Sequence, residues 1–272
     1  MSPYTVHETL LKVSGVGLSL GGKPILRSVD AEIRNIVRPG LSQGQVVCLL
    51  GPSGVGKTQL FQLLAGLKKP DEGSVLVTSK SLPVRAGMVG VVAQQCTLFP
   101  HRTVLGNLTV AARLRGHSAK QSEERALEYL KRFDISEKRS VYPGALSGGQ
   151  RQRVAIIQQL LSSEHFLLMD EPFSGLDPLM KDAACRLIAE VAAADELNTI
   201  VVTTHDIESA IAIADSLWLL GRDRDASGSS LGARIQQVYD LAAMGLAWDP
   251  DIQSKPEFFQ MAKEVKAKFA SL

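Results

Sequence analysis

The chain has 272 residues, of which 45% are hydrophobic and 21% charged, and its formal net charge is +2. This composition is typical of a globular protein with one large domain, with or without a small appendage, and excludes a disordered chain. A nucleic-acid binder normally carries a concentrated basic face, and 30 basic against 28 acidic residues give no electrostatic case for one.

The N-terminal third predicts strands around a glycine-rich loop. Residues 1–13 lack the basic segment and apolar core of a signal peptide. Short strands are expected at 18–20 and 29–33, followed by a loop near residues 38–44. The apolar run 46–50 is bounded by glycine and predicts a buried central strand, and a helix should occupy Lys57–Leu67.

The middle of the chain changes to helix and then alternates. Helical spacing of apolar residues predicts a helix over Glu123–Phe133, and a second helix follows Ser147. The remaining expected elements alternate as strand 166–169, helix 180–193, strand 199–203, helix 207–214 and strand 216–220. This alternation predicts an α/β fold, with a mostly parallel sheet flanked by helices and a helical insertion at about 96–162.

The C-terminal tail is less regular. A polar loop is expected over 222–232 and a strand over 233–241. Ser254–Glu257 has the form of a capping box, and the helix after it would carry one apolar stripe of Phe258, Met261, Val265 and Phe269. We expect this helix to pack on the main domain, with docking of a partner or regulator as the alternative.

A phosphate-binding loop is predicted between the 46–50 strand and the following helix. Its residues are Gly51, Pro52, Ser53, Gly54, Val55, Gly56, Lys57 and Thr58, which satisfy G-x-x-x-x-G-K-T. Glycines let successive backbone N–H groups turn inward as an anion nest at the start of a helix. Lys57 would contact the phosphates and the Thr58 hydroxyl would ligate Mg²⁺, so ATP and Mg²⁺ are the expected cofactors.

Polar side chains follow two further apolar strands. Asp170 and Glu171 end the 166–169 strand, where Asp170 would hold Mg²⁺ and Glu171 would act as general base toward water. His205 follows the 199–203 strand, and a γ-phosphate contact is the role we expect. Ligands sit at the carboxyl ends of parallel strands, so these side chains should converge.

A second glycine-bearing helix start occurs at Leu146-Ser147-Gly148-Gly149-Gln150. This segment matches the signature motif of the ABC ATPase family letter for letter, and the chain resembles that family from about residue 10 to 222. In the family, the signature of one subunit closes over ATP held by the phosphate loop of another. The resemblance therefore implies that Ser147, Gly148, Gly149 and Gln150 bind the ATP of a second ATPase subunit.

Other family motifs occur in the expected order. Gln94 matches the Q-loop glutamine, which implies contacts to Mg²⁺ and γ-phosphate beside the groove for a permease segment. Ser174–Asp177 matches the D-loop, so Asp177 is expected at the ATP site, and His205 matches the switch histidine. Residues 98–104 resemble the corresponding stretch in importer ATPases. The resemblance implies an ABC cassette with an antiparallel β subdomain and a helical subdomain at about 96–162.

Three departures from the family pattern stand out. Leu20 occupies the place of an aromatic residue that stacks on adenine, which predicts weaker base stacking, or stacking by another residue such as Tyr4, and relaxed base selectivity. The loop around residues 34–44 is longer than usual, and Gln158 replaces a common arginine.

The resulting expectation is an ATPase domain at 1–222, an appendage at 223–272, and ATP hydrolysis that energises an importer of a small polar or anionic solute. Permease subunits, a second cassette and a periplasmic or extracellular solute-binding protein are the expected partners, with no nucleic acid. Three cysteines without a C-x-x-C pair favour a reducing cytosol, and the expected place is the cytoplasmic face of the inner or plasma membrane, as a peripheral subunit. A lipid-extruding or division-related complex, or a soluble ATPase of DNA repair or translation, are the alternatives.

Overall fold

The structure is a computed structural model that describes residues 4–38, 40, 44–77, 81–94, 96–163, 166–195, 197–224, 230–249, 251–269 and 272. Its strands are β1 (Thr5–Leu20), β2 (Lys23–Val37), β3 (Gln45–Leu50), β4 (Glu72–Val77), β5 (Leu82–Pro83), β6 (Gly90–Val92), β7 (Phe166–Asp170), β8 (Thr199–Thr204), β9 (Ser216–Arg224) and β10 (Ser230–Asp240). Its α-helices are α1 (Lys57–Leu64), α2 (Val104–Leu114), α3 (Ala119–Arg132), α4 (Gly148–Ser162), α5 (Pro178–Ala192), α6 (Ile207–Ile213) and α7 (Pro256–Phe269). Short 3₁₀ turns η1 (Ser136–Lys138), η2 (Pro143–Ala145) and η3 (Ile252–Ser254) complete the assignment.

The described strands form one sheet in the order β5-β4-β1-β2-β10-β9-β3-β8-β7-β6. Strands β9, β3, β8, β7 and β6 are parallel to one another, whereas β1, β2, β4 and β5 pair antiparallel. Strand β10 lies between these two parts, antiparallel to β9 and parallel to β2. The expected parallel sheet with an antiparallel part is therefore confirmed.

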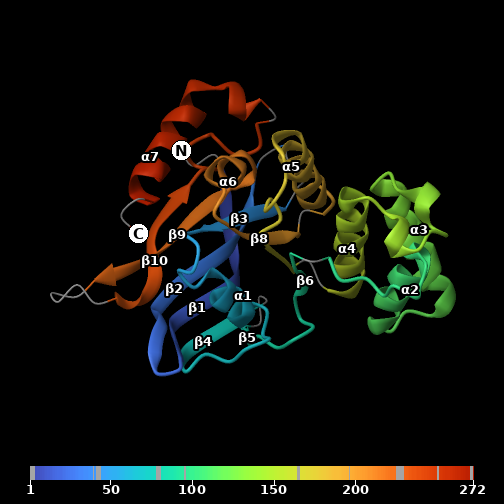
Figure 1. Ribbon diagram of the computed structural model, residues 1–272, viewed down its shortest axis with the longest axis horizontal. Helices are drawn as coiled ribbons and strands as arrows, with labels where there is room; N and C mark the ends of the chain where they lie inside the picture. Colours follow the sequence, from blue (N-terminus) through green and yellow to red (C-terminus); the bar gives the residue numbers. More distant parts are fainter. Residues whose placement is uncertain are drawn as a thin grey trace.

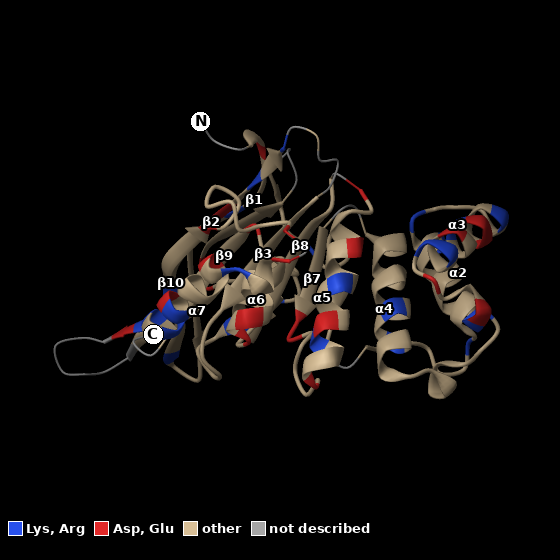
Figure 2. Ribbon diagram, turned by 90° about the horizontal axis from the view of Figure 1, so that it is seen from above, with Lys and Arg blue, Asp and Glu red and all other residues tan. Residues whose placement is uncertain are grey.

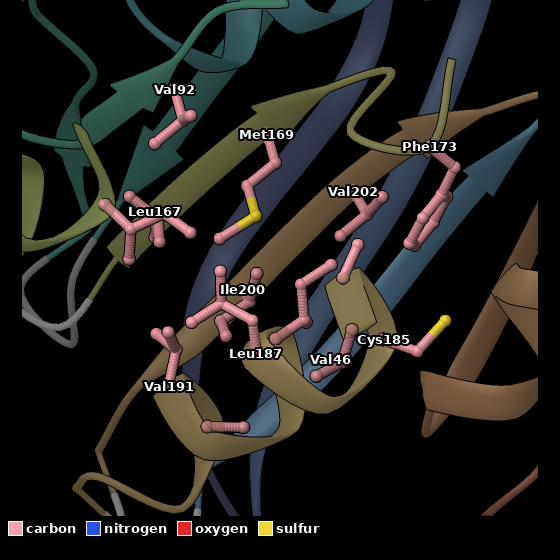
Figure 3. Close-up of a cluster of buried hydrophobic side chains, with 14 of the residues drawn as sticks. Val46, Val92, Leu167, Met169, Phe173, Cys185, Leu187, Val191, Ile200 and Val202 are labelled. Carbon is pink, nitrogen blue, oxygen red and sulfur yellow. The ribbon is translucent and has the colours of Figure 1, made fainter. Parts of the chain in front are cut away.

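Strand β3 is buried on both faces, as its continuous apolar run predicted. Cys48 and Leu50 pack in the cluster that contains α5, α6 and α7, whereas Val47 and Leu49 pack in the cluster that contains α1. Because side chains alternate along a strand, the helices cover opposite faces of the sheet (Figure 1). Figure 3 shows Leu187 and Val191 of α5 packed against the strands of this core.

The inserted helices α2, α3 and α4 lie together at one end of the sheet (Figure 1). Helix α4 begins at Gly148, and the predicted helix after Ser147 is confirmed. Acidic and basic residues are interspersed along α3 and α5 (Figure 2). In the described part of the chain, no helix combines the length and apolar character that crossing a bilayer requires.

Several sequence expectations were wrong in detail. The first two strands form a hairpin much longer than the predicted pieces, with register shifts that interrupt the alternation. Helix α2 and strands β4 to β6 were not predicted. The polar loop expected over 222–232 is shorter, because β9 runs to Arg224 and β10 starts at Ser230. Part of the 34–44 loop belongs to β2, and residues 39 and 41–43 lie outside the described residues.

The C-terminal tail contributes to the sheet and to the core of the protein. Residue 222, the predicted boundary, lies within β9, and β10 is an interior strand of the sheet. The stripe on α7 is buried at Phe258, Met261 and Val265. The capping box predicted at Ser254 was wrong, because the Ser254 hydroxyl donates to the Asp251 carbonyl at 2.7 Å and α7 begins only at Pro256.

A buried carboxyl group ties the tail to β3. Asp215 is 2% exposed and accepts hydrogen bonds from the Val46 N–H, at 2.8 Å, and from the Trp248 indole. The Arg38 guanidinium lies 5.6 Å from the centre of the Trp248 ring. Burial raises the pKa of Asp215 to about 7, against the opposing effect of these donors.

Candidate functional site

The phosphate loop connects β3 to α1, as the motif predicted. Gly54 and Gly56 have φ of +78° and +124°, which side chains rarely adopt, so the loop needs glycine at both positions. Lys57 is 7% exposed and its Nζ donates to the carbonyl oxygens of Gly51 and Pro52 at 2.8 and 3.3 Å. Ser53, Gly54 and Thr58 are exposed at this loop.

Lys57, Glu171 and His205 form a continuous chain of charged and polar contacts. The Lys57 Nζ lies 3.3 Å from Glu171 Oε1, and His205 Nδ1 lies 2.9 Å from Glu171 Oε2. These residues follow three different strands, β3, β7 and β8, which are adjacent and parallel. The sequence prediction that the three strand ends converge is therefore confirmed.

The backbone holds Glu171 in a restricted position. Its φ is +48°, in the left-handed region that residues with a side chain seldom adopt. Its N–H donates to the Thr203 carbonyl at 2.9 Å, which fixes the turn after β7 to the neighbouring strand β8. Such strained positions cluster at active sites, where the surrounding structure overrides the local cost.

Asp170 is oriented by a residue that the sequence interpretation gave no role. The Thr203 hydroxyl donates to Asp170 Oδ1 at 2.5 Å, at the carboxyl ends of β7 and β8. This bond leaves the second carboxylate oxygen available. Asp170 and the exposed Thr58 hydroxyl are hard oxygen ligands of the kind Mg²⁺ takes, so these residues fit the ion expected here.

A hollow of about 200 Å³ lies beside the acidic residues. Gln94, Asp170 and Glu171 line it together with Gly148 and Gly149 from the start of α4. The residues lining it, all from the described part of the chain, include none of the phosphate loop. The acidic residues thus have the Q-loop glutamine on one side and the signature glycines on another.

The signature segment is a surface feature with its own capping. Ser147 Oγ accepts from the Gln150 N–H at 3.3 Å, and Gln150 Oε1 accepts from the Ser147 N–H at 3.0 Å. This reciprocal pair satisfies two N–H groups of the first turn, while Ser147 and Gly148 stay exposed. The helix start is preformed and accessible to another molecule.

Asp177 also caps a helix. Its Oδ1 accepts from the Met180 N–H at 3.0 Å at the start of α5, and the residue is exposed. The structure therefore shows a helix-capping role for Asp177 in a single chain, in addition to the ATP-site role predicted from the D-loop match.

A second hollow, of about 620 Å³, also has Gln94 among its lining residues. It is lined as well by Cys96, Leu98 and Pro100 and by Pro143, Gly144 and Arg151. Phe99 and Tyr142, which are neighbours of lining residues in sequence, are 44% and 54% exposed. A concave surface with exposed aromatic side chains is typical of a protein contact.

At the expected adenine end, Leu20 terminates β1 and is 40% exposed. The sequence interpretation also missed Arg222 of β9, whose guanidinium donates to the Gly54 carbonyl of the phosphate loop. Thr203 carried a usable signal, since it is polar at the end of an apolar strand. Arg222 carried none, because only the sheet order brings it to the loop.

Comparison with known proteins agrees with this geometry. Residues 35–174 match the family described as ABC transporter. An aliphatic sulfonates import ATP-binding protein of Rhodococcus jostii is 35% identical over 210 residues, which are 77% of this chain and 70% of that protein. A taurine import ATP-binding protein of Yersinia pestis is 34% identical over 261 residues, covering 95% and 96%.

Some relatives are longer. The chain spans 52% of a glycine betaine/carnitine/choline transport ATP-binding protein of Bacillus subtilis, with 35% identity over 207 residues. Among solved structures, a dimeric ATP-binding cassette in a post-hydrolysis state with ADP and phosphate is 26% identical, with a TM-score of 0.65. That match covers 85% of this chain and 99% of the other. The chain therefore belongs to the ABC transporter family, as one of its ATP-binding cassettes.

Proposed function

We propose that this chain is the ATP-hydrolysing subunit that energises an importer of a small polar or anionic solute. The observation that carries the proposal is the contact chain Lys57–Glu171–His205 at the carboxyl ends of three parallel strands. It places a phosphate-binding cation, a candidate base and a candidate switch residue within one site. The relatives described above are named as ATP-binding proteins for the import of aliphatic sulfonates and of taurine, which supports a small polar or anionic solute.

Each residue has a role that follows from its position. The inward N–H groups of the Gly51–Thr58 loop and Lys57 bind the phosphates of ATP. Thr58 and Asp170 would hold Mg²⁺, with Gln94 as a further candidate ligand, and the ion would supply positive charge against the phosphates. Glu171 accepts a proton from the attacking water, and His205 contacts the γ-phosphate and orients Glu171.

The Glu171 carboxylate lies beside Lys57, with Oε1 3.3 Å from Nζ. The γ-phosphate requires the same cation, so ATP binding exchanges the carboxylate for a phosphate at Lys57. Glu171 is then released from the lysine and free to act on water. We infer that the base becomes available only after nucleotide has entered, which limits hydrolysis to the loaded site.

Two chains complete each site. The exposed and preformed helix start at Ser147 supports contact with ATP bound to a second copy, and Asp177 lies at the accessible start of α5. The dimeric cassette to which the chain is similar supports the same assembly. Closure on ATP and opening after hydrolysis would provide the movement that drives transport.

The hollow around Gln94 is the proposed seat for a permease segment, and a solute-binding protein is a further proposed partner. Phe99 and Tyr142, exposed residues next in sequence to lining residues of this hollow, support a protein contact there. The chain would thus act as a peripheral subunit at the cytoplasmic face of the membrane. Purification from membranes with the tagged chain should recover a membrane protein, and substitution of Phe99 and Tyr142 by serine should reduce that recovery.

Mixing two inactive variants tests the shared site. In Lys57→Ala the phosphate loop fails, and in Ser147→Arg the signature fails. A mixed dimer retains one intact pair, so an equal mixture should recover roughly a quarter of the wild-type sites if subunits pair at random. ATP turnover of the mixture no higher than that of either variant alone would contradict the two-chain site.

A further inference from the structure

Arg222 contacts the phosphate loop from behind. Its Nη2 donates to the Gly54 carbonyl at 2.8 Å, although 168 residues separate the two in sequence. The residue lies near the end of β9, outside every motif of the family signature set described above. The motifs therefore do not account for its contact with Gly54.

The sheet brings β9 to the loop. Strand β9 is the parallel neighbour of β3, with Leu219 beside Leu50 in the register. Where β3 leads into the loop, a Cβ added to Gly51 would lie 2.7 Å from the Leu220 carbonyl oxygen. This close approach leaves the residues after Leu220 directly behind the loop, so the position of Arg222 follows from the packing of two strands.

The bonded carbonyl belongs to a residue with special geometry. Gly54 has φ of +78°, in the left-handed conformation. An anion nest depends on the orientation of successive backbone N–H groups. A donor bonded to the Gly54 carbonyl fixes the orientation of that peptide, whose Val55 N–H donates to the Pro52 carbonyl at 3.3 Å, and so helps to hold the shape of the loop.

Asp223, the acidic neighbour of Arg222 in sequence, pairs with two other arginines. Asp223 lies 3.1 Å from Arg27 Nη2 and 2.5 Å from Arg234 Nε, and it also accepts from Gln236 at 3.2 Å. No ion pair found between described residues includes Arg222. Its Nε is buried without a hydrogen-bond partner, and among the described residues the bond to Gly54 anchors the guanidinium.

We propose that Arg222 is a positioning residue for the nucleotide phosphates. It holds the Gly54 carbonyl, and with it the backbone of the phosphate loop, and it adds positive charge next to the loop. The proposal rests on the proposed function, since it concerns ATP binding by this loop. Arg222 acts through the Gly54 carbonyl of the loop, so its expected effect is on affinity and not on the chemical step.

The test separates affinity from chemistry. Arg222→Ala should raise the dissociation constant for a fluorescent ATP analogue, and KM for ATP, by about 5- to 10-fold, which corresponds to the usual net contribution of one hydrogen bond. The value of kcat at saturating ATP should stay within about twofold. Arg222→Lys, which keeps the charge and a donor, should recover most of the affinity.

Arg234→Ala is the matched control, because it removes the same charge from the next strand but is bonded to Asp223. Its KM should equal that of wild type. Three results would overturn the proposal: a KM of Arg222→Ala equal to that of wild type, a loss confined to kcat, or the same increase in KM in Arg234→Ala.

If Arg222→Ala does not fold, the variants Arg222→Lys and Arg222→Gln provide the test. Wild-type ATP affinity in Arg222→Gln overturns the role, and a larger loss of affinity in Arg222→Gln than in Arg222→Lys supports it. A wild-type chain without ATP turnover would refute the proposed function instead.

Discussion

Replacing Glu171 with glutamine should strengthen ATP binding while it abolishes turnover. The substitution keeps the size of the side chain and removes its charge. Lys57, whose Nζ lies 3.3 Å from Glu171 Oε1, then has no carboxylate to exchange for the γ-phosphate. Loss of the charge also removes the candidate base, so the two effects on the ATPase run in opposite directions.

The expected gain in ATP affinity follows from the contact between Lys57 and Glu171. At 3.3 Å the Coulomb attraction is about 5 kcal/mol for an effective dielectric constant of about 20, which is a gross value. Lys57 keeps its bonds to two carbonyl groups, and the Glu171 side chain is 18% exposed, so the net cost to ATP binding is smaller. About 1.5 kcal/mol is reasonable for a charged hydrogen bond, which corresponds to roughly tenfold tighter binding.

Binding is measured by equilibrium titration with a fluorescent ATP analogue without Mg²⁺, at protein concentrations that keep the chain monomeric. Turnover is measured by phosphate release with Mg²⁺ and should fall about 10²- to 10⁴-fold. ATP should also trap the variant as a dimer in size-exclusion chromatography. Glu208→Gln, which changes a glutamate paired with Lys266 on the surface, is the control.

Two results would refute this reasoning separately. An unchanged or weaker affinity in Glu171→Gln would show that the carboxylate does not compete with phosphate at Lys57. Unchanged turnover would show that Glu171 is not the base.

Two further predictions concern the buried Asp215 beside β3 and Leu20 at the expected adenine end of the site. The folded pKa of Asp215 is raised to about 7 from an unfolded value near 3.9, so its contribution to stability is complete below about pH 4 and is lost as pH rises to 7. Relative to Asp215→Asn, wild type should lose up to about 4 kcal/mol of unfolding free energy between these pH values in denaturant titrations, and parallel pH profiles would contradict this. Leu20→Tyr supplies the missing aromatic face and should tighten ATP binding by about 1 kcal/mol without changing kcat, whereas equal affinities would show that adenine does not reach this residue.

Local motifs predicted the centre of the site well. The spacing Gly51–Thr58 specifies a strand, a nest and a helix without reference to the rest of the chain, and Asp170 and Glu171 follow a strand whose apolar run is unambiguous. Their convergence with His205 followed from one rule about the ends of parallel strands. The catalytic and binding roles given to these residues stay predictions.

Long-range packing accounts for what the sequence interpretation missed. Arg222 meets Gly54 only because β9 is next to β3, and nothing near residue 222 indicates that order. The bond between Trp248 and Asp215 likewise joins the tail to the base of the sheet. The full length of β1 was hidden because its register shifts break the alternation of polar and apolar residues.

The place of β10 has a consequence for how the protein is made. Within the sheet, β1 and β2 reach the nucleotide-binding strands only through β10, which emerges from the ribosome after residue 230. Pairing of the N-terminal hairpin within the sheet is therefore completed only after about 85% of the chain has been made (230 of 272 residues), a long closure that slows folding. A nascent chain stopped before β10 exposes two unpaired strand edges, which makes chaperone protection most necessary late in synthesis.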